Sequence, residues 1–459
     1  MNNLKEKFDA IFKAYDIRGV YPDQIDEKVV FQIALGFVDF LKPKKVALGR
    51  DVRFSSPSLF NSVKNALISR GIEVWDIGEI TTDQLYFAVA YYNLDGGMTI
   101  TASHNPKEYN GIKFVRERSM PISADNGLLE IKDLALQAKE GEGGGTVREV
   151  TIINDYLDYV VQVVKIDGIK PFKFVANPNF GVASENIKKF IEKYNLPCQI
   201  IPLNFEKNGN FPKGRPDPLI PENRQETSQL IKENQADFGV AWDADADRCF
   251  FFDENGDFIH PNFITAVLVE EILKKYPGGT VIHDTRAFWA VKEAVEKNGG
   301  VLVLNKAGHA FLKEALKNYN GVFAAETSAH YYFKDFYNCD NGFLPFLYIL
   351  KILSEKNQSL AILVQEWRGK YAISDEINFK ADNPEKIEMI LDEIQKEYQQ
   401  GAVNLIDGIS YEFGDWRFNL RPSNTEPLVR LNIEAKSEEI LEEKINELTE
   451  KIKKLVEGN

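Results

Sequence analysis

Cysteine is scarce in this sequence: the chain of 459 residues has three. Cys198, Cys249 and Cys339 are odd in number, and no two of them stand at the spacing of a metal-binding or redox pair. Secreted domains that depend on disulfide bonds are much richer in cysteine. We therefore expect three packing residues in a protein of the reducing cytoplasm.

Long apolar runs are also missing. The most apolar stretch, at residues 343–350, is interrupted by Pro345, whereas a membrane-spanning helix needs about 20 apolar residues. The first 18 residues mix Lys5, Glu6 and Asp9 with their apolar side chains, so they lack the apolar core of a secretory signal. The sequence thus predicts neither a membrane segment nor export.

Basic residues are outnumbered by acidic ones. Lys and Arg total 55 against 69 Asp and Glu, a net charge of −14, which is the wrong sign for a chain that grips nucleic acid phosphates. The composition, 44% hydrophobic and 27% charged, is typical of a globular protein. At roughly 150 residues per domain, the length predicts about three domains, or four if some are small.

Strand-like and helix-like stretches alternate in three similar cycles, which predicts three related α/β domains. The expected strands cover residues 45–49, 72–77 and 96–101, then 172–176, 199–203 and 238–242, then 280–283, 301–304 and 322–325. From about residue 371 the order changes to strand, helix, several strands and a last helix, which indicates a smaller α+β domain. We expect domains at residues 1–155, 156–258, 259–370 and 371–459.

The last helix has one apolar stripe, formed by Ile440, Leu441, Ile445, Leu448, Ile452 and Leu455. Their spacing of three and four residues is typical of a helix that buries one face. The stripe spans too few heptads to favour a coiled coil, so we expect this helix to pack on its own sheet.

The first candidate site follows the expected strand at 96–101, where residues 101–106 read TASHNP. Ser103 could act there as a nucleophile or phosphate carrier, with His104 and Lys113 on the same loop as proton-transfer groups. The same residues are also typical of a polar turn.

The second candidate site places Asp243, Asp245 and Asp247 directly after the expected strand at 238–242. Carboxylate oxygens suit Mg²⁺, and three like charges this close are costly without a cation or hydrogen-bond donors. Arg248 could hold a phosphate oxygen beside the metal. An EF-hand would need glycine where Arg248 stands and helices as flanks, so we favour a magnesium loop.

Two further polar loops follow strands. Residues 326–330 read ETSAH, and upstream residues 306–309 read KAGH; their imidazoles, acid and hydroxyl could bind sugar hydroxyls or could simply be polar strand ends. Residues 421–427 read RPSNTEP, in which a guanidinium, hydroxyls and an amide could form a cup for an anion. A β-turn with two prolines is the alternative.

Together, these loops in this order resemble those of the α-D-phosphohexomutase family, specifically its phosphomannomutase/phosphoglucomutase branch. The resemblance covers essentially the whole chain and includes the segment YDIRG at residues 15–19. It implies three α/β domains and a smaller C-terminal domain around one active-site cleft, with small-molecule sugar phosphates as the partners.

The resemblance also implies roles for individual residues. Ser103 is the phosphorylated serine, and it holds Mg²⁺ together with Asp243, Asp245 and Asp247. Arg18 is similar to the family's arginine near the phosphoserine and Lys113 to its proton-transfer lysine, with His104 and Arg248 assisting. The residues that resemble substrate-binding positions are Tyr15, Lys306, Gly308, His309, Glu326, Ser328, His330, Arg421, Ser423, Asn424 and Thr425.

The implied activity interconverts hexose 1-phosphate and hexose 6-phosphate, of mannose and/or glucose, through hexose 1,6-bisphosphate. Thr327 stands at a variable position of the specificity loop and Ala329 replaces a frequent glycine, so the preferred sugar stays open. The alternatives are a phosphoglucosamine mutase and a non-catalytic protein that binds divalent cations or sugar phosphates. The sequence does not fix the oligomeric state.

Overall fold

The computed structural model describes residues 2–381, 383–423 and 428–457. Contacts within the chain divide it into two compact units. We call residues 1–258 with 332–357 unit 1, and residues 259–331 with 358–459 unit 2. Each unit is described by itself.

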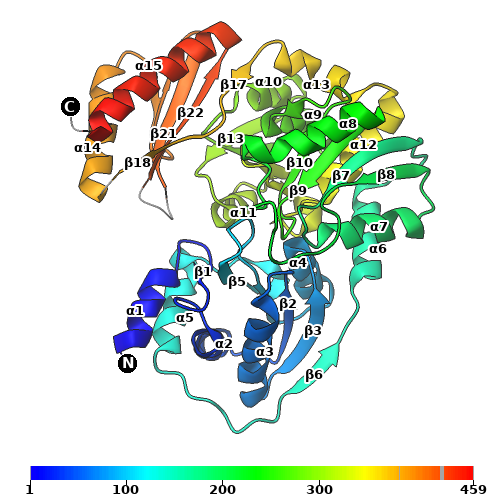
Figure 1. The fold of residues 1–459 in the computed structure, drawn as a ribbon, viewed down its shortest axis with the longest axis vertical. Helices are drawn as coiled ribbons and strands as arrows, with labels where there is room; N and C mark the ends of the chain where they lie inside the picture. The colour runs from blue at the N-terminus through cyan, green and yellow to red at the C-terminus, as the bar shows by residue number, and fades with distance from the viewer. Residues whose placement is uncertain (1, 382, 424–427, 458–459) are drawn as a thin grey trace. The chain divides into compact units, whose positions relative to one another are not determined.

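Unit 1 begins with a layered α/β arrangement (Figure 1, blue to cyan). Its elements are α1 (Asn2–Ile11), β1 (Ile17–Val20), α2 (Glu27–Leu41), β2 (Lys45–Arg50), α3 (Ser56–Ser69), β3 (Glu73–Glu79), α4 (Thr82–Tyr91), β4 (Gly96–Ile100), β5 (Tyr109–Arg116), α5 (Leu128–Ala135) and β6 (Thr146–Glu149). The sheet has the order β1-β5-β4-β2-β3-β6. Strands β2, β3, β4 and β6 are parallel, while β5 runs antiparallel beside β4. The parallel arrangement places the segment after β4 at the carboxyl edge of the sheet.

A second α/β layer of unit 1 carries the acidic loop. It contains α6 (Ile153–Val164), β7 (Phe172–Asn177), α7 (Ala183–Lys193), β8 (Cys198–Pro202), α8 (Gln225–Asn234), β9 (Phe238–Trp242), β10 (Cys249–Phe252) and β11 (Phe258–Ile259). The sheet order is β11-β10-β9-β7-β8. Strands β9 and β10 pair antiparallel, with Trp242 opposite Cys249. The acidic loop is therefore the tight connection of a hairpin, flanked by strands and not by helices.

Unit 1 is completed by β15 (Tyr331–Phe333) from its second residue onward, β16 (Cys339–Asp340) and α12 (Leu344–Lys356). Short 3-10 turns lie at Glu117–Ser119, Ala124–Asn126, Pro221–Arg224 and Lys334–Phe336. The apolar stretch at 343–350 forms the first half of α12, where Phe346 packs edge-on against Trp242. This stretch is therefore a buried helix of the core.

Unit 2 starts with another α/β layer: α9 (Pro261–Lys275), β12 (Thr280–Asp284), α10 (Trp289–Lys297), β13 (Val301–Asn305), α11 (His309–Asn318), β14 (Phe323–Ala325) and α13 (Leu360–Arg368). Strand β12 pairs parallel with both β13 and β14. The loops that follow these three strands therefore leave the same edge of the layer.

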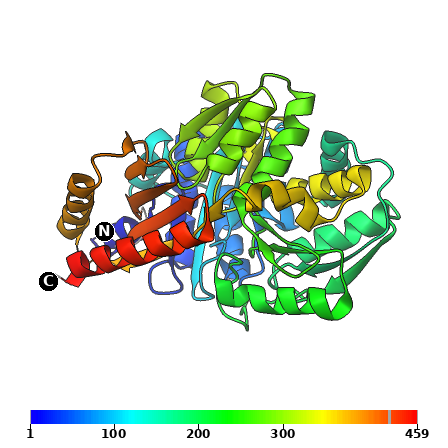
Figure 2. The same ribbon diagram turned by 90° about the horizontal axis from the view of Figure 1, so that it is seen from above.

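The C-terminal part of unit 2 is an antiparallel sheet with two helices. It contains β17 (Ala372–Ile373), β18 (Ile377–Lys380), α14 (Pro384–Glu397), β19 (Ala402–Asn404), β20 (Ile409–Glu412), β21 (Trp416–Pro422), β22 (Leu428–Ala435) and α15 (Glu438–Glu457). Strand β22 pairs with β21 on one side and with both β17 and β18 on the other. Figure 2 shows α15 along the strands. Leu441, Leu448 and Ile452 of α15 are buried in one core with Phe418 and Ile433, which confirms that the apolar stripe packs on its own sheet.

Two buried charges fasten this sheet to the preceding layer within unit 2. The Glu434 carboxylate accepts hydrogen bonds from the backbone N–H groups of Phe288 and Trp289, at 2.9 and 3.0 Å. The Arg417 guanidinium donates to the carbonyl of Arg286 at 2.7 Å. Because these contacts join β21 and β22 to the start of α10, they fix the C-terminal sheet against the residues that follow β12.

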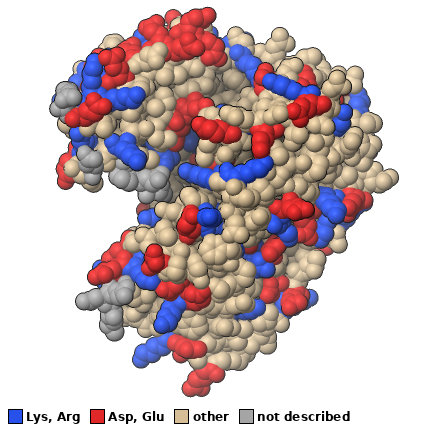
Figure 3. All heavy atoms as spheres, in the orientation of Figure 1, with Lys and Arg blue, Asp and Glu red and all other residues tan. Residues whose placement is uncertain are grey.

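The structure confirms the expected fold class, three α/β layers followed by a smaller α+β part. All three cysteines are free thiols, and Cys249 and Cys339 are buried. In the described part of the chain, no helix has the length and apolar character needed to cross a membrane. Acidic side chains gather over the first turns of α15 (Figure 3), where Glu438, Glu439, Glu442 and Glu443 are exposed.

Candidate active site

Ser103 lies in the loop between β4 and β5, and its backbone is unusual. The residue is in the left-handed region at φ +48°, a conformation that costs a non-glycine residue free energy. The loop holds it there, because its N–H donates to Thr101 Oγ1 at 2.9 Å and its carbonyl accepts from Arg53 Nη2 at 2.5 Å. The serine hydroxyl is thus placed by the loop geometry, and the side chain is buried.

Arg53, which the sequence analysis missed, clamps this whole loop. Its guanidinium donates to the carbonyls of Ser103, Asn105, Pro106 and Tyr109 at 2.5 to 3.0 Å. Asp51 pairs with the Nε at 3.1 Å, and both side chains are fully buried. A buried ion pair that satisfies four carbonyls fixes a backbone which no regular ladder of hydrogen bonds would hold.

The Ser103 hydroxyl makes two contacts that bear on its reactivity. It donates to Asp243 Oδ2 at 2.9 Å and lies 3.1 Å from His104 Nδ1. Burial, together with repulsion from Arg248, Arg215 and nearby Arg18, holds the pKa of His104 well below its usual range. The imidazole is therefore neutral near pH 7, so one of its ring nitrogens can accept a hydrogen bond.

The three aspartates of the acidic loop converge as predicted. Asp243, Asp245 and Asp247 are buried, and each offers a carboxylate oxygen within 4.8 Å of the other two. Ala246 takes a positive φ of +54° between them, which turns the chain sharply. Among the described residues, Asp245 Oδ1 is buried without a hydrogen-bond partner. Convergent carboxylate oxygens, one of them buried and unpartnered, could hold a divalent metal ion.

Lys113 does not lie on the serine loop, as the sequence analysis expected, but in the middle of β5. Because β5 runs antiparallel to β4, the side chain reaches the acidic loop, and Nζ lies 2.8 Å from Asp245 Oδ2 and 2.5 Å from Asp247 Oδ2. Burial would lower the pKa of Lys113, but the two carboxylates outweigh it and raise the pKa above its usual value. In this arrangement Lys113 is a protonated donor.

Thr82, at the start of α4, also holds the acidic loop and was not predicted. Its hydroxyl donates to Asp245 Oδ2 at 2.6 Å, and its N–H donates to the Asp245 carbonyl at 2.9 Å. The first N–H groups of a helix lack partners within the helix, so the loop satisfies one of them. This contact joins the two α/β layers of unit 1.

Arg18 and Arg248 bring positive charge to the same cluster. Arg248 Nε pairs with Asp243 Oδ2 at 2.9 Å, and its Nη1 with Asp217 Oδ1 at 3.2 Å. Arg18 pairs with Asp16 at 2.8 Å and donates to the Ala102 carbonyl at 3.1 Å. Both arginines are therefore oriented by carboxylates of unit 1 beside the serine loop. Tyr15, also a predicted site residue, directly precedes Asp16 in the chain and is half-buried.

In unit 2, the expected specificity loop forms a tight turn after β14. The Glu326 N–H donates to the His330 carbonyl at 2.9 Å, and its side chain accepts from the Gly308 N–H at 2.8 Å. His330 Nδ1 lies 3.3 Å from Glu326 Oε2 and 3.1 Å from Ser328 Oγ. The structure thus brings Glu326, Ser328, His330 and Gly308 together within unit 2.

The two departures from the family pattern have physical counterparts. Thr327 is buried and does not face outward, because its hydroxyl and N–H both donate to Asp284, at 3.0 and 2.7 Å. Ala329 has a φ of +66°, the region in which glycine is free of strain. The frequent glycine at this position is therefore explained by backbone geometry.

The remaining residues of this region lie at the start of α11. Gly308 is its N-cap with a φ of +130°, His309 is its first residue and half-buried, and Lys306 is exposed on the preceding loop. The helix starts at His309, directly after this glycine cap. His309 is therefore a helical residue and not part of a loop.

The expected anion cup is described in part. Arg421 is buried on β21, with Nη2 3.0 Å from Glu376 Oε2, and the Ser423 N–H donates to the Leu428 carbonyl at 2.8 Å. Asn424 and Thr425 lie outside the described residues. The sequence analysis missed Glu376, which sits on the segment before β18.

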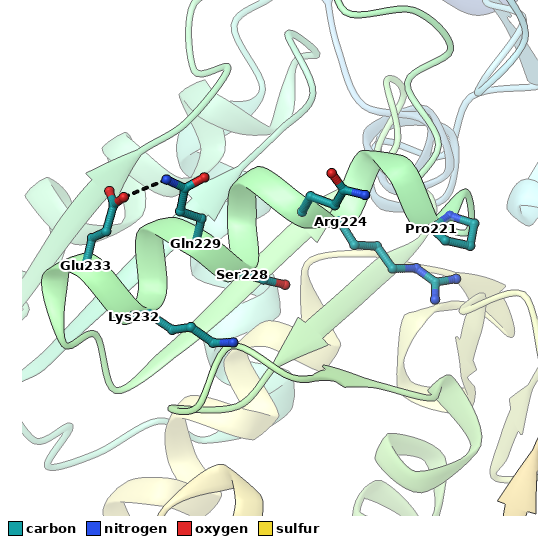
Figure 4. A pocket seen from close by; sticks show the side chains of 7 residues that line it. Pro221, Arg224, Ser228, Gln229, Lys232 and Glu233 are labelled. Carbon is teal, nitrogen blue, oxygen red and sulfur yellow. Dashed lines mark hydrogen bonds between the residues drawn. The ribbon is translucent and has the colours of Figure 1, made fainter.

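A separate hollow on unit 1 contains none of the predicted site residues. It is lined by Pro221, Arg224, Gln225, Ser228, Gln229, Lys232 and Glu233, on α8 and the turn before it (Figure 4). Gln229 donates to Glu233 at 2.6 Å, and the Arg224 guanidinium stacks 3.8 Å from the centre of the Phe258 ring. Because these groups are engaged by the chain itself, we assign no ligand to this hollow.

Comparison with protein families matches four successive domains. These are the phosphoglucomutase/phosphomannomutase α/β/α domain I at residues 9–142, domain II at 154–256 and domain III at 260–371, and the C-terminal domain at 376–451. The matches cover most of the chain and follow the order of the family.

Curated relatives agree over nearly the full length. A phosphomannomutase of Vibrio cholerae is 43% identical over 97% of this chain and 98% of its own. A protein of Xanthomonas campestris named phosphohexose mutases is 42% identical over 97% of this chain and 99% of its own. Among solved structures, a phosphoglucomutase/phosphomannomutase family protein from Burkholderia thailandensis superposes with a TM-score of 0.87 at 28% identity, covering 98% of each chain.

The layered fold, the buried serine beside three aspartates and these relatives together define an enzyme of the phosphotransferase class, a phosphohexomutase. The chain belongs to the phosphoglucomutase/phosphomannomutase family.

Proposed function

We propose that this enzyme interconverts hexose 1-phosphate and hexose 6-phosphate, of mannose and/or glucose, through a phosphoserine at Ser103 and a hexose 1,6-bisphosphate. The observation that carries the proposal is the Ser103 hydroxyl, 2.9 Å from Asp243 in a buried cluster that also contains Arg248. A phosphoryl carrier needs such surroundings, because phosphoryl transfer depends on positioning and on charge neutralisation.

The resident metal of the proposal is Mg²⁺, held by Asp243, Asp245, Asp247 and the oxygen of Ser103. Hard carboxylate oxygens and a small buried site favour this ion. When bound, it would neutralise negative charge on the phosphoryl group. The convergent carboxylates and the unpartnered Asp245 Oδ1 support this assignment.

The chain's own residues account for the rest of the chemistry. In the first transfer the bond between phosphorus and the Ser103 oxygen breaks, a bond from phosphorus to a sugar hydroxyl oxygen forms, and the hydroxyl proton leaves. His104, 3.1 Å from the Ser103 hydroxyl, and Lys113, beside Asp245, are the candidate groups for moving that proton. In the second transfer the bisphosphate, turned around, returns its other phosphoryl group to Ser103. Arg18 and Arg248 orient the phosphoryl oxygens through their guanidinium forks.

Residues of unit 2 are proposed to recognise the sugar and the phosphate that is not transferred. Carboxylate, hydroxyl and imidazole groups of Glu326, Ser328 and His330 can hydrogen-bond sugar hydroxyls, assisted by Gly308, His309 and Lys306. In unit 1, Tyr15 is a further proposed substrate-binding residue. Arg421 and Ser423, with Asn424 and Thr425, would hold the distal phosphate. Each end of the bisphosphate must occupy this grip in turn.

A coupled assay tests the proposal directly. Mannose 1-phosphate, glucose 1-phosphate and glucosamine 1-phosphate are compared, with Mg²⁺ and a hexose 1,6-bisphosphate as primer. We expect turnover of mannose or glucose phosphate, abolition of turnover in Ser103→Ala, and an intact mass that shows one phosphate on the parent protein only. Turnover of glucosamine phosphate alone would identify a phosphoglucosamine mutase, and binding of sugar phosphate without turnover would identify a binding protein.

A further inference from the structure

Glu376 is a half-buried carboxylate, about a quarter exposed, surrounded by three arginines of unit 2. Its Oε2 lies 3.0 Å from Arg421 Nη2 and 3.9 Å from Arg286 Nη1, and its Oε1 lies 3.1 Å from Arg430 Nη1. Burial would raise the pKa of Glu376, but Arg421, Arg430 and Arg286 outweigh it and hold the pKa below its usual value. The carboxylate is therefore ionised throughout the neutral range.

Two of the three arginines belong to the proposed substrate-binding regions of unit 2. Arg421 belongs to the distal phosphate grip. Arg286 lies 3.2 Å from Ser328 Oγ and 3.5 Å from Glu326 Oε1, on the specificity loop. Glu376 thus contacts the arginine that would hold the phosphate and the arginine that holds the loop for the sugar.

We propose that Glu376 is a counter-anion built into the phosphate grip, which balances Arg421 and Arg430 and limits how tightly the grip holds a phosphate. The inference deepens the proposed function and rests on it. It assigns Glu376 a positioning and tuning role, without contact to the reacting atoms.

The physical reason is the repulsion between like charges at close range. A phosphate dianion that pairs with the buried Arg421 must approach a carboxylate already paired with the same guanidinium, and at such short distances salt screens the repulsion only in part. The proposed reaction needs a limited affinity, because the grip must release one phosphate of the bisphosphate before it takes the other. A grip without the carboxylate would hold its first phosphate too long.

The test removes the charge at nearly constant shape. Glu376→Gln and Glu376→Ala are compared with Glu376→Asp, which keeps the charge, and with Glu385→Gln, which removes an exposed charge on α14. Glucose 1-phosphate binding is measured by calorimetry in a Ser103→Ala background, in which no turnover occurs. Arg421→Ala shows how much of the measured affinity depends on the grip.

We expect both uncharged variants to bind glucose 1-phosphate more tightly, by on the order of tenfold, while Glu376→Asp and Glu385→Gln bind like the parent. With Ser103 present, KM and kcat should both fall in the uncharged variants. Unchanged or weaker binding by uncharged variants with the parent's unfolding midpoint would overturn the proposal, since Glu376 would then only align Arg421.

The binding measurement does not require turnover. Absence of mutase activity in the parent would therefore overturn the proposed function, while the glucose 1-phosphate affinities of the Glu376 variants could still be compared with that of the parent.

Discussion

Asp83, in the first turn of α4, is a buried carboxylate that accepts hydrogen bonds from two hydroxyl groups. Its replacement by a neutral residue should stabilise the enzyme in a pH-dependent way. Tyr156 donates a hydrogen bond to it at 2.5 Å, and the Thr81 hydroxyl donates a second. Burial raises the pKa of Asp83 to about 7, against the effect of both hydrogen bonds, and repulsion from Asp340 adds to the rise. The neighbouring Thr82 holds the acidic loop, so this carboxylate lies next to the candidate active site.

The magnitude follows from linkage. In the unfolded chain Asp83 ionises near its ordinary value of 3.8, whereas in the folded enzyme it stays protonated up to about pH 7. The folded state therefore binds more protons between these values, and stability falls as pH rises through this window. Each pH unit is about 1.4 kcal/mol, so the loss attributable to Asp83 between pH 5 and pH 8 is at most about 3 kcal/mol.

Asp83→Asn removes this loss, because an amide does not titrate and can still accept the hydrogen bond from Tyr156. In urea unfolding, the free energy of unfolding of the variant minus that of the parent should increase by about 2 to 3 kcal/mol between pH 5 and pH 8. The difference between the two proteins isolates this one group from the other titrating residues. A gap that stays constant, or narrows with rising pH, would refute the reasoning, since Asp83 would then be ionised at pH 5 in the folded enzyme.

Three further predictions concern the site. Asp245→Asn should raise the Mg²⁺ concentration for half-maximal activity by on the order of tenfold, since one anionic ligand becomes neutral; a metal titration that matches the parent's would mean that the aspartates are not the metal site. Arg53→Lys should lower the free energy of unfolding by about 2 to 4 kcal/mol and reduce kcat, because an ammonium cannot satisfy four carbonyls; parent-like unfolding curves and kcat would contradict the clamp. Arg421→Ala should impair forward and reverse turnover alike, with Arg421→Lys rescuing only part; loss in one direction alone, with bisphosphate retention untouched, would show that separate loops hold the two ends.

The strands and the loops after them could be predicted from the sequence because apolar runs of five or six residues ended at polar residues. Strand β9 lies at the predicted residues 238–242, and the alternating aspartates follow it as expected. The meeting of Ser103 with Asp243, 140 positions away, does not follow from periodicity. Only the resemblance to a known family pointed to it.

The residues that the sequence analysis missed, Arg53, Thr82 and Glu376, share one property. Each is a charged or polar side chain in a segment that contains no recognisable sequence motif. Arg53 precedes α3 in a segment that reads as an ordinary turn, yet it is fully buried. Lys113 was placed on the wrong kind of element because β5 is an antiparallel strand inserted between β1 and β4, which the βα rhythm does not predict. Burial of a charge depends on its distant partner, and a single sequence does not show that partner.

The pairing of basic groups with carboxylates has a consequence for how the site meets its substrate. Arg248 is held by Asp217 and Arg421 by Glu376, at 3.2 and 3.0 Å, while Lys113 is shared by two aspartates. A guanidinium held this way is oriented before a phosphate arrives, so little reorganisation is needed on binding. It is also partly neutralised, because an unpaired buried charge would be costly. Removal of the carboxylate and removal of the cation should therefore change phosphate affinity in opposite directions, which a simple loss of structure would not do.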